Sequence, residues 1–94
     1  MKTTTVIFGP GVDGAIVSLI DYVDLESIPA VIVFLEHVQQ RLVKTLSTFP
    51  ESGSPYQGRV RTLSVEGYTF LYEYHEAAHE VHVLEMIAPG RNWR

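Results

Sequence analysis

The sequence predicts an α+β fold in which a helical hairpin packs on a mostly antiparallel four-stranded sheet, in the order β-α-α-β-β-β. Three observations support this fold class. Residues 3–8 are rich in β-branched side chains and run into a Gly-Pro-Gly turn, which is typical of a strand. Residues 12–49 repeat apolar side chains at helical spacing, whereas residues 59–88 alternate them as strands do.

Two amphipathic helices are expected in the first half of the chain. The first covers residues 12–23, where aspartates lie opposite an apolar face formed by Val12, Ile16, Leu19, Ile20 and Val23. The second begins near Ser27, a candidate cap followed by Pro29 in the first turn, and ends before Pro50. Its apolar stripe consists of Val31, Leu35, Val38, Leu42 and Leu46. Because few residues separate the helices, we expect an antiparallel hairpin.

Three strands follow the helices, at residues 59–65, 68–75 and 80–88. Glu66-Gly67 joins the first two in a tight hairpin, since glycine supplies the positive φ that such a turn requires. Residues 51–58 are expected to form a loop because of their Ser, Gly and Pro content. The strand over residues 68–75 has an aromatic face, which consists of Tyr68, Phe70, Tyr72 and Tyr74. This face can serve as a base-stacking platform or as a face of the core. The core is favoured, because alternating strands usually bury their apolar face.

Composition narrows the class of protein. The 94 residues make a single domain (1–94), and the lack of cysteine excludes disulfides and thiolate chemistry. No stretch resembles a signal peptide, and the longest apolar run, residues 30–35, is too short to span a bilayer, so we expect a soluble cytoplasmic protein.

His75, His79 and His82 flank the last turn, where strand register decides whether they meet. We expect surface histidines there, with neither a metal nor a cofactor.

The net charge of −4 is unevenly distributed along the chain. No basic residue lies between Lys2 and Arg41, and the arginines of the C-terminal part are Arg59, Arg61, Arg91 and Arg94. Four arginines are fewer basic groups than the broad basic surface of a nucleic-acid binder normally contains. A protein partner is therefore favoured, and no sequence-specific nucleic-acid binding is expected. Two of these arginines flank Trp93, a mix enriched at interface hot spots, although a solvated edge and a frayed terminus would explain the same residues.

The order of these signals resembles the RelE/ParE family of toxins from bacterial toxin–antitoxin pairs. The likeness covers the whole chain, from Val6-Ile-Phe-Gly-Pro10 through Phe49-Pro-Glu-Ser-Gly53 to Gly90-Arg-Asn-Trp93. It implies a helical hairpin on a sheet, neutralisation by a cognate antitoxin, and one of two activities. RelE-like members cut mRNA in the ribosomal A site, whereas ParE-like members inhibit DNA gyrase.

Several features favour the ParE-like activity, which needs no catalytic residues. RelE-like ribonucleases usually carry arginines where this chain has Ser64 and Thr69, and a toxin that docks on ribosomal RNA is expected to be basic. The Gly90-x-x-Trp93 ending also resembles the ParE branch, although Pro89 stands where a histidine is common. We therefore expect a gyrase inhibitor, with a ribosome-dependent endoribonuclease or a divergent, non-toxic interaction module as the alternatives.

Two sets of candidate contact residues follow from this interpretation. The target would be bound by Arg59, Arg61, Arg91, Asn92, Trp93 and Arg94. The antitoxin would be bound by Leu71, Tyr72, Tyr74 and Trp93. It would add a strand to an exposed sheet edge and lay an amphipathic helix on the hairpin. A homodimer, or a heterotetramer with the antitoxin, is compatible with this arrangement.

Overall fold

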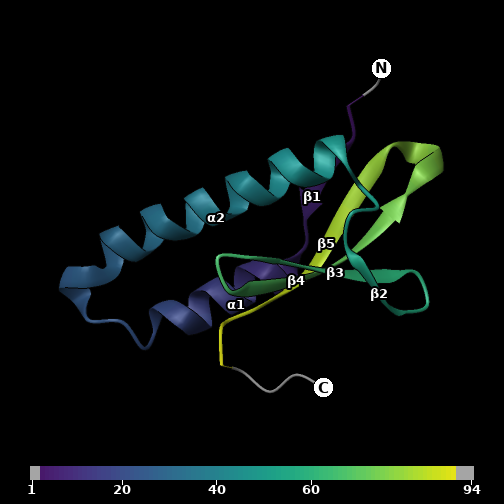
Figure 1. Cartoon of the computed structure of the whole chain (residues 1–94). Coiled ribbons are helices and arrows are strands. Elements are labelled where there is room, and N and C mark those ends of the chain that lie inside the picture. Colours follow the sequence, from purple (N-terminus) through teal and green to yellow (C-terminus); the bar gives the residue numbers. More distant parts are fainter. Residues whose placement is uncertain (1–2, 91–94) are drawn as a thin grey trace.

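The computed structural model describes residues 3–90 of the chain (Figure 1). Its elements, in chain order, are β1 (Thr5–Phe8), α1 (Pro10–Ile20), the 3-10 turn η1 (Leu25–Ser27), α2 (Ile28–Thr48), β2 (Ser54–Gln57), β3 (Val60–Val65), β4 (Tyr68–His75), the 3-10 turn η2 (Glu76–Ala78) and β5 (Glu80–Ile87). The α+β class is therefore confirmed. Within the described residues, no helix is long and apolar enough to cross a membrane.

The sheet has five strands, one more than expected, in the order β1-β5-β4-β3-β2. β1 runs parallel to β5, and the other neighbouring strands are antiparallel. The additional strand is β2, so the prediction of a loop over residues 51–58 is wrong in its central part. All residues of β2 are exposed and show no alternation, and Pro55 is tolerated because β2 lies at the edge of the sheet.

The tight turn between β3 and β4 is confirmed. Glu66 and Gly67 have positive φ angles of 52° and 84°, as the two central residues of a type I′ turn require. Glu66 also forms an ion pair with Arg41 of α2. Because both side chains of this pair are exposed, the pair contributes about 1 kcal/mol at most.

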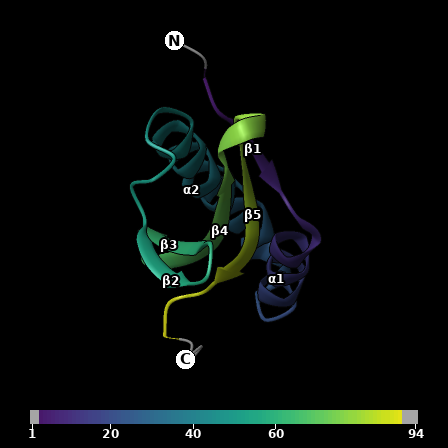
Figure 2. The ribbon, with the colours of Figure 1, turned by 90° about the vertical axis from the view of Figure 1, so that its right-hand side faces the viewer.

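Both helices pack into one core on the same face of the sheet, and they diverge from a common loop (Figure 1). α1 begins at Pro10, earlier than predicted, because proline at the first helical position loses no hydrogen bond. α2 ends at Thr48, before Phe49-Pro50 as predicted, whereas the Ser27 side chain makes no capping hydrogen bond. Figure 2 shows α2 behind the strands and α1 beside β5.

The core lies between this hairpin and the covered face of the sheet. α2 contributes the buried part of its predicted stripe, namely Leu35, Val38, Leu42 and Leu46. The largest fully buried side chains of the sheet are Phe70 and Tyr72, so the aromatic face of β4 is a core face, as predicted. Burying a side chain of this size contributes about 1.5–3 kcal/mol.

A bulge in β5 receives the first turn of α1. The pairing of β4 with β5 steps from Leu71 opposite Glu85 to Tyr72 opposite Val83, which leaves Leu84 as the extra residue. Gly11 approaches this bulge so closely that a Cβ atom on it would collide with the Leu84 carbonyl oxygen. The missing side chain of Gly11 therefore allows α1 to lie against β5.

Candidate functional site

The helices cover one face of the sheet, and we call the other face the open face. Side chains alternate along β4. Because Phe70 and Tyr72 are buried under the helices, Thr69, Leu71, Glu73 and His75 point to the other side of the sheet. The cross-strand register extends this alternation to β3 and β5. On these three strands the open face consists of Val60, Thr62, Ser64, Thr69, Leu71, Glu73, His75, Glu80, His82, Glu85 and Ile87. All are at least partly exposed, so a ligand or partner can reach them.

One end of the open face carries four titratable side chains, which we call the His–Glu cluster: Glu73, His75, Glu80 and His82. Strand register places Glu73 opposite His82 and His75 opposite Glu80. His75 Nε2 lies 3.2 Å from Glu73 Oε1, and His82 Nε2 lies 3.0 Å from Glu80 Oε1. The two imidazole rings stand edge to face with centroids 4.5 Å apart. Each imidazole therefore has one carboxylate partner and one imidazole neighbour.

This geometry suits proton transfer. The four side chains are between 30% and 39% exposed, so a substrate can contact them. Imidazole acts as a general acid or base near neutral pH, and a hydrogen-bonded carboxylate fixes its orientation and tautomer. Two rings side by side can remove one proton and deliver another in the same reaction. Within residues 3–90, no three His, Cys, Asp or Glu side chains are arranged to hold a metal ion.

Sequence spacing did not identify this cluster. His79 lies between its histidines but serves the turn: its N–H donates to the Glu76 carbonyl at 3.1 Å, and its carbonyl accepts from the Thr5 N–H at 2.9 Å. The signal in the sequence is a repeated Glu-x-His, at residues 73–75 and 80–82. On two antiparallel neighbours in the right register, that repeat places both histidines and both glutamates on one face.

Ser64 and Thr69 occupy the part of the open face near the β3–β4 turn. They are opposite each other in the register, and their hydroxyl oxygens lie 3.2 Å apart. These are the positions where the resemblance predicts arginines in a ribonuclease. The residues assigned above to the open face include neither lysine nor arginine. That face therefore offers hydroxyl groups and the His–Glu cluster, and no guanidinium group for a phosphate.

The structure places the two strand arginines of the predicted target site elsewhere. Arg61 is opposite the buried Tyr72, and its Nη1 donates to the carbonyls of Gly53 at 2.9 Å and Glu51 at 3.3 Å. Its guanidinium group thus holds the loop before β2. Arg59 is exposed, and its Nη2 lies 3.5 Å from the Tyr74 carbonyl. The remaining predicted target contacts, Arg91, Asn92, Trp93 and Arg94, lie outside the described residues.

Of the predicted antitoxin contacts, Leu71 lies on the open face and Tyr72 lies in the core. The Tyr72 hydroxyl accepts a hydrogen bond from the Gly53 N–H at 2.9 Å. Burial raises the pKa of this hydroxyl, and the hydrogen bond from Gly53 opposes the shift. Because Tyr72 has no exposed surface, it cannot contact a partner directly in the folded chain.

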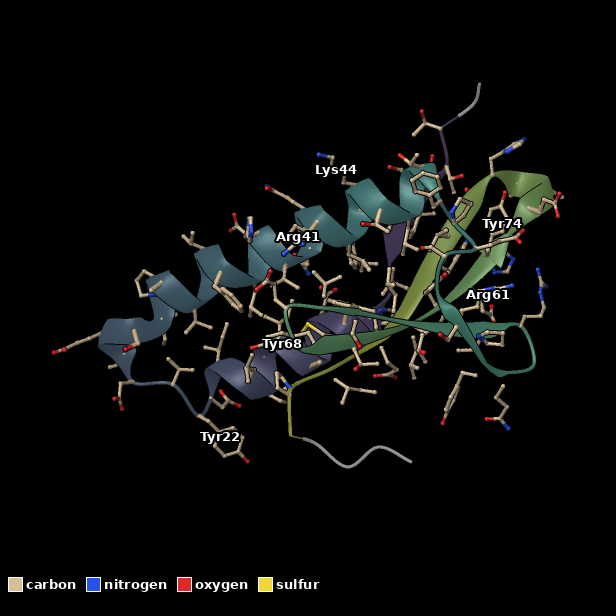
Figure 3. All side chains as sticks on the ribbon, in the orientation of Figure 1. Tyr22, Arg41, Lys44, Arg61, Tyr68 and Tyr74 are labelled. Atoms are coloured by element: carbon tan, nitrogen blue, oxygen red, sulfur yellow. The ribbon has the colours of Figure 1, made fainter. Side chains whose placement is uncertain are left out.

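Tyr74, in contrast, is accessible. It lines a shallow hollow together with Thr48, Phe49, Pro50, Glu51 and Ser52. Figure 3 shows Tyr74 and Arg61 near the same end of the sheet, beyond the C-terminal end of α2. The last predicted antitoxin contact, Trp93, lies outside the described residues. Leu71 and Tyr74 are therefore the predicted antitoxin contacts that the described part of the chain can offer.

The chain resembles solved structures of RelE proteins. The RelBE2 toxin–antitoxin complex of Mycobacterium tuberculosis matches with a TM-score of 0.61 and 18% identity, over 92% of this chain and 98% of that chain. The isolated RelE toxin of E. coli matches with a TM-score of 0.60 and 13% identity, over 95% of this chain and 87% of that chain. The intact E. coli RelBE toxin–antitoxin complex matches with a TM-score of 0.59 and 14% identity, over 94% of this chain and 99% of that chain.

These matches show that the chain has the RelE fold. No family model and no curated protein sequence matches the chain. The part of the expectation that concerned the fold is therefore confirmed. The preference for the ParE branch gains no specific support, because the matched structures named above are RelE proteins.

Proposed function

We propose that the chain is the toxin of a toxin–antitoxin pair and is neutralised by a cognate antitoxin. The observation that carries this proposal is the RelE fold over 92–95% of the chain. Two of the three solved structures named above are toxin–antitoxin complexes. The chain also offers accessible apolar groups, such as Leu71 and Phe49, that a bound antitoxin would cover.

The proposed target is mRNA on the ribosome, which sequence reasoning had ranked below gyrase. The matched structures are RelE proteins, and the resemblance links the RelE branch to mRNA cleavage. The His–Glu cluster supplies suitable chemistry. A neutral imidazole takes the proton of a ribose 2′-hydroxyl, whose oxygen attacks the adjacent phosphorus. The bond from phosphorus to the 5′-oxygen breaks, and the second, protonated imidazole donates a proton to that leaving oxygen.

The products of this step are a 2′,3′-cyclic phosphate and a free 5′-hydroxyl, and the protons balance between the two rings. Either His75 or His82 can be the base, because each has a carboxylate partner within 3.2 Å. General acid–base catalysis of this kind contributes about 10²–10⁴-fold to a rate. Removing both imidazoles should therefore abolish most of the cleavage.

Inhibition of gyrase is the second candidate, and one observation favours it. The described residues of the open face include no lysine or arginine that could hold an RNA phosphate, and the chain carries a net charge of −4. A toxin that acts by binding a protein needs no such group. The tail contacts predicted for this activity, residues 91–94, remain a prediction.

A reconstituted translation reaction separates the two candidates. Primer extension on the mRNA should show cleavage with the natural chain and a loss of about 100-fold or more with His75→Ala/His82→Ala. The matched control is His37→Ala, which removes an exposed imidazole from α2 and should cleave normally. Intact mRNA together with inhibited supercoiling by gyrase would assign the second candidate instead.

A further inference from the structure

Arg41 differs from the other cations of the described chain in the group that holds it. The lysines and arginines among residues 3–90 are Arg41, Lys44, Arg59 and Arg61. The guanidinium groups of Arg59 and Arg61 lie against backbone carbonyls, as described above. Figure 3 shows Lys44 directed away from the sheet and Arg41 directed from α2 towards the strands. The partner of Arg41 is a side chain, Glu66 in the β3–β4 turn.

Arg41 helps to line a hollow at the edge of β3, which we call the edge hollow. Its volume is about 250 Å³, and its lining residues are Arg41, Thr45, Leu63, Ser64, Val65 and Glu66. Three consecutive residues of β3 line it although their side chains alternate between the two faces, so the hollow lies along the strand edge. The pairing of β2 with β3 reaches only Thr62, which leaves this edge uncovered in the described chain.

The groups of the edge hollow suit an anion. An uncovered strand edge presents backbone N–H donors, and Thr45 and Ser64 add hydroxyl groups. The Arg41 guanidinium can donate two parallel hydrogen bonds to one phosphate group. A phosphate placed in this hollow would therefore meet a cation, hydroxyl groups and peptide N–H groups together.

Glu66 competes with such an anion for Arg41. The side chains of Arg41 and Glu66 are 54% and 40% exposed, and exposed ion pairs of this kind contribute little to stability. An incoming phosphate can therefore replace the carboxylate at low cost. Because Glu66 also carries the same sign of charge as a phosphate, removing its carboxylate should strengthen the binding of an anion.

The edge hollow adjoins the open face at some distance from the His–Glu cluster. Ser64 belongs to both the hollow and the open face, and its hydroxyl oxygen lies 3.2 Å from that of Thr69. Thr69 and Glu73 are four residues apart on β4, which corresponds to about 13 Å along an extended strand. Arg41 is thus too far away to contact a phosphate that the histidines act on. A single RNA strand along the open face would bring another of its phosphates to Arg41.

We propose that Arg41 binds a backbone phosphate of the RNA substrate in the edge hollow, in exchange for its ion pair with Glu66. The inference rests on the proposed function, in which mRNA is the substrate. Arg41 is a positioning residue here, because the phosphate that it binds is not the one that is cleaved. From α2 it supplies the guanidinium group that the open face lacks. A phosphate contact carries no information about the base, so no sequence preference follows from it.

Binding is measured without the ribosome, by fluorescence anisotropy of a labelled single-stranded RNA whose 2′-hydroxyls are methylated to prevent cleavage. Arg41→Gln should weaken the affinity about tenfold and reduce the slope of log affinity against log salt by about 0.7, the contribution of one phosphate. The matched control is Lys44→Gln, which removes the same charge from the same helix at a side chain directed away from the sheet. It should change the affinity by less than about twofold, because salt screens a distant charge.

Glu66→Gln should have the opposite effect and raise the affinity about threefold or more. Its matched control is Glu36→Gln, which removes the same charge from an exposed position of α2 outside the edge hollow. Arg41→Gln and Glu66→Gln break the same ion pair, so a purely structural role of that pair would change the affinity in the same direction in both variants. The double variant Arg41→Gln/Glu66→Gln has the net charge of the natural chain but should still bind more weakly, since the ligand of the phosphate is missing.

Cleavage on the ribosome provides a second measurement. Arg41→Gln should raise KM about tenfold and leave kcat within about twofold, because its phosphate contact is the same in the ground state and in the transition state. A lower kcat at unchanged KM would contradict a positioning role.

Three binding results would overturn the inference: no saturable binding of the RNA by the natural chain, equal losses in Arg41→Gln and Lys44→Gln, or natural affinity in the double variant. The last two would assign the binding to net charge. Failure of the proposed function is visible separately. His75→Ala/His82→Ala should bind the methylated RNA as the natural chain does, and a chain that binds it through Arg41 but cuts no mRNA would contradict the cleavage proposal alone.

Discussion

The two faces of the sheet have different surroundings, and mutations on them should have different effects. The covered face buries Phe70 and Tyr72 completely against the helices, where packing is dense and each contact contributes to stability. The open face exposes His75 and His82, whose removal would leave no cavity. Substitutions at buried positions of β4 should therefore change mainly the stability of the chain. Substitutions at its open-face positions should change mainly the chemistry of the candidate site.

The largest expected effect is that of Phe70→Ala. Truncating this fully buried ring leaves a cavity and should lower the free energy of unfolding by about 3–5 kcal/mol. Leu71→Ala, one residue along on the open face, should cost about 1 kcal/mol, since Leu71 is only partly buried. Urea unfolding followed by circular dichroism measures both. Equal losses would contradict the assignment of one covered and one open face.

Two glycines of α1 extend the comparison to the helix. Gly11→Ala should destabilise the chain by about 1–3 kcal/mol, because the new methyl group meets a backbone carbonyl that cannot rotate away. Gly14→Ala should stabilise it by about 0.5–1 kcal/mol, because no atom lies within 4 Å of the added group and alanine favours the helix. Thermal unfolding shows whether each variant loses or gains stability. If both variants gain stability, α1 does not lie on β5 as described.

Tyr72→Phe tests a polar contact on the covered face. At neutral pH it should cost about 1 kcal/mol, because the Gly53 N–H loses its acceptor. Burial raises the pKa of the Tyr72 hydroxyl above its ordinary value of 10.0. The unfolded chain therefore releases this proton at lower pH than the folded chain does, and stability should fall as the pH rises above about 10.

The phenylalanine variant has no such proton and should lose less stability than the natural chain over this alkaline range. Tyr22→Phe is the control, because its ring is 83% exposed. Urea unfolding at neutral and alkaline pH provides the measurement. An identical alkaline loss in the natural chain and in Tyr72→Phe would show that another group causes it.

The smallest expected change in stability belongs to the open face. His75→Ala/His82→Ala should alter the free energy of unfolding by no more than about 0.5–1 kcal/mol, because both side chains are partly exposed. Urea unfolding of the preparation used for mRNA cleavage gives this value. A loss of several kcal/mol would mean that the cluster is a structural element, and any loss of cleavage would then reflect unfolding.

The covered face was predictable from the sequence because burial imposes a period. The stripe of α2 around Leu42 repeats at helical spacing, and β4 was predicted with its observed bounds, Tyr68–His75. Where burial imposes no period, prediction failed. β2 is exposed throughout, so its Ser, Pro and Gln indicate only a loop.

The candidate site was less predictable, because it depends on register. Arg61 was expected at a target surface, but its position opposite Tyr72 directs it to the loop carbonyls of Glu51 and Gly53. His75 and His82 meet because β4 and β5 pair with Glu73 opposite His82. A shift of one residue would move every such side chain to the other face.

The parallel pairing of β1 with β5 also has a consequence for synthesis of the chain. Val6 is opposite Val81, so the first strand finds its neighbour only when the last strand has been made. These two residues are 75 positions apart. At about 5–20 residues per second the ribosome needs roughly 4–15 seconds to add the residues between them. During that interval the apolar stripes of both helices have no completed sheet to cover them. A partner protein that binds those stripes can therefore reach the nascent chain before it is folded.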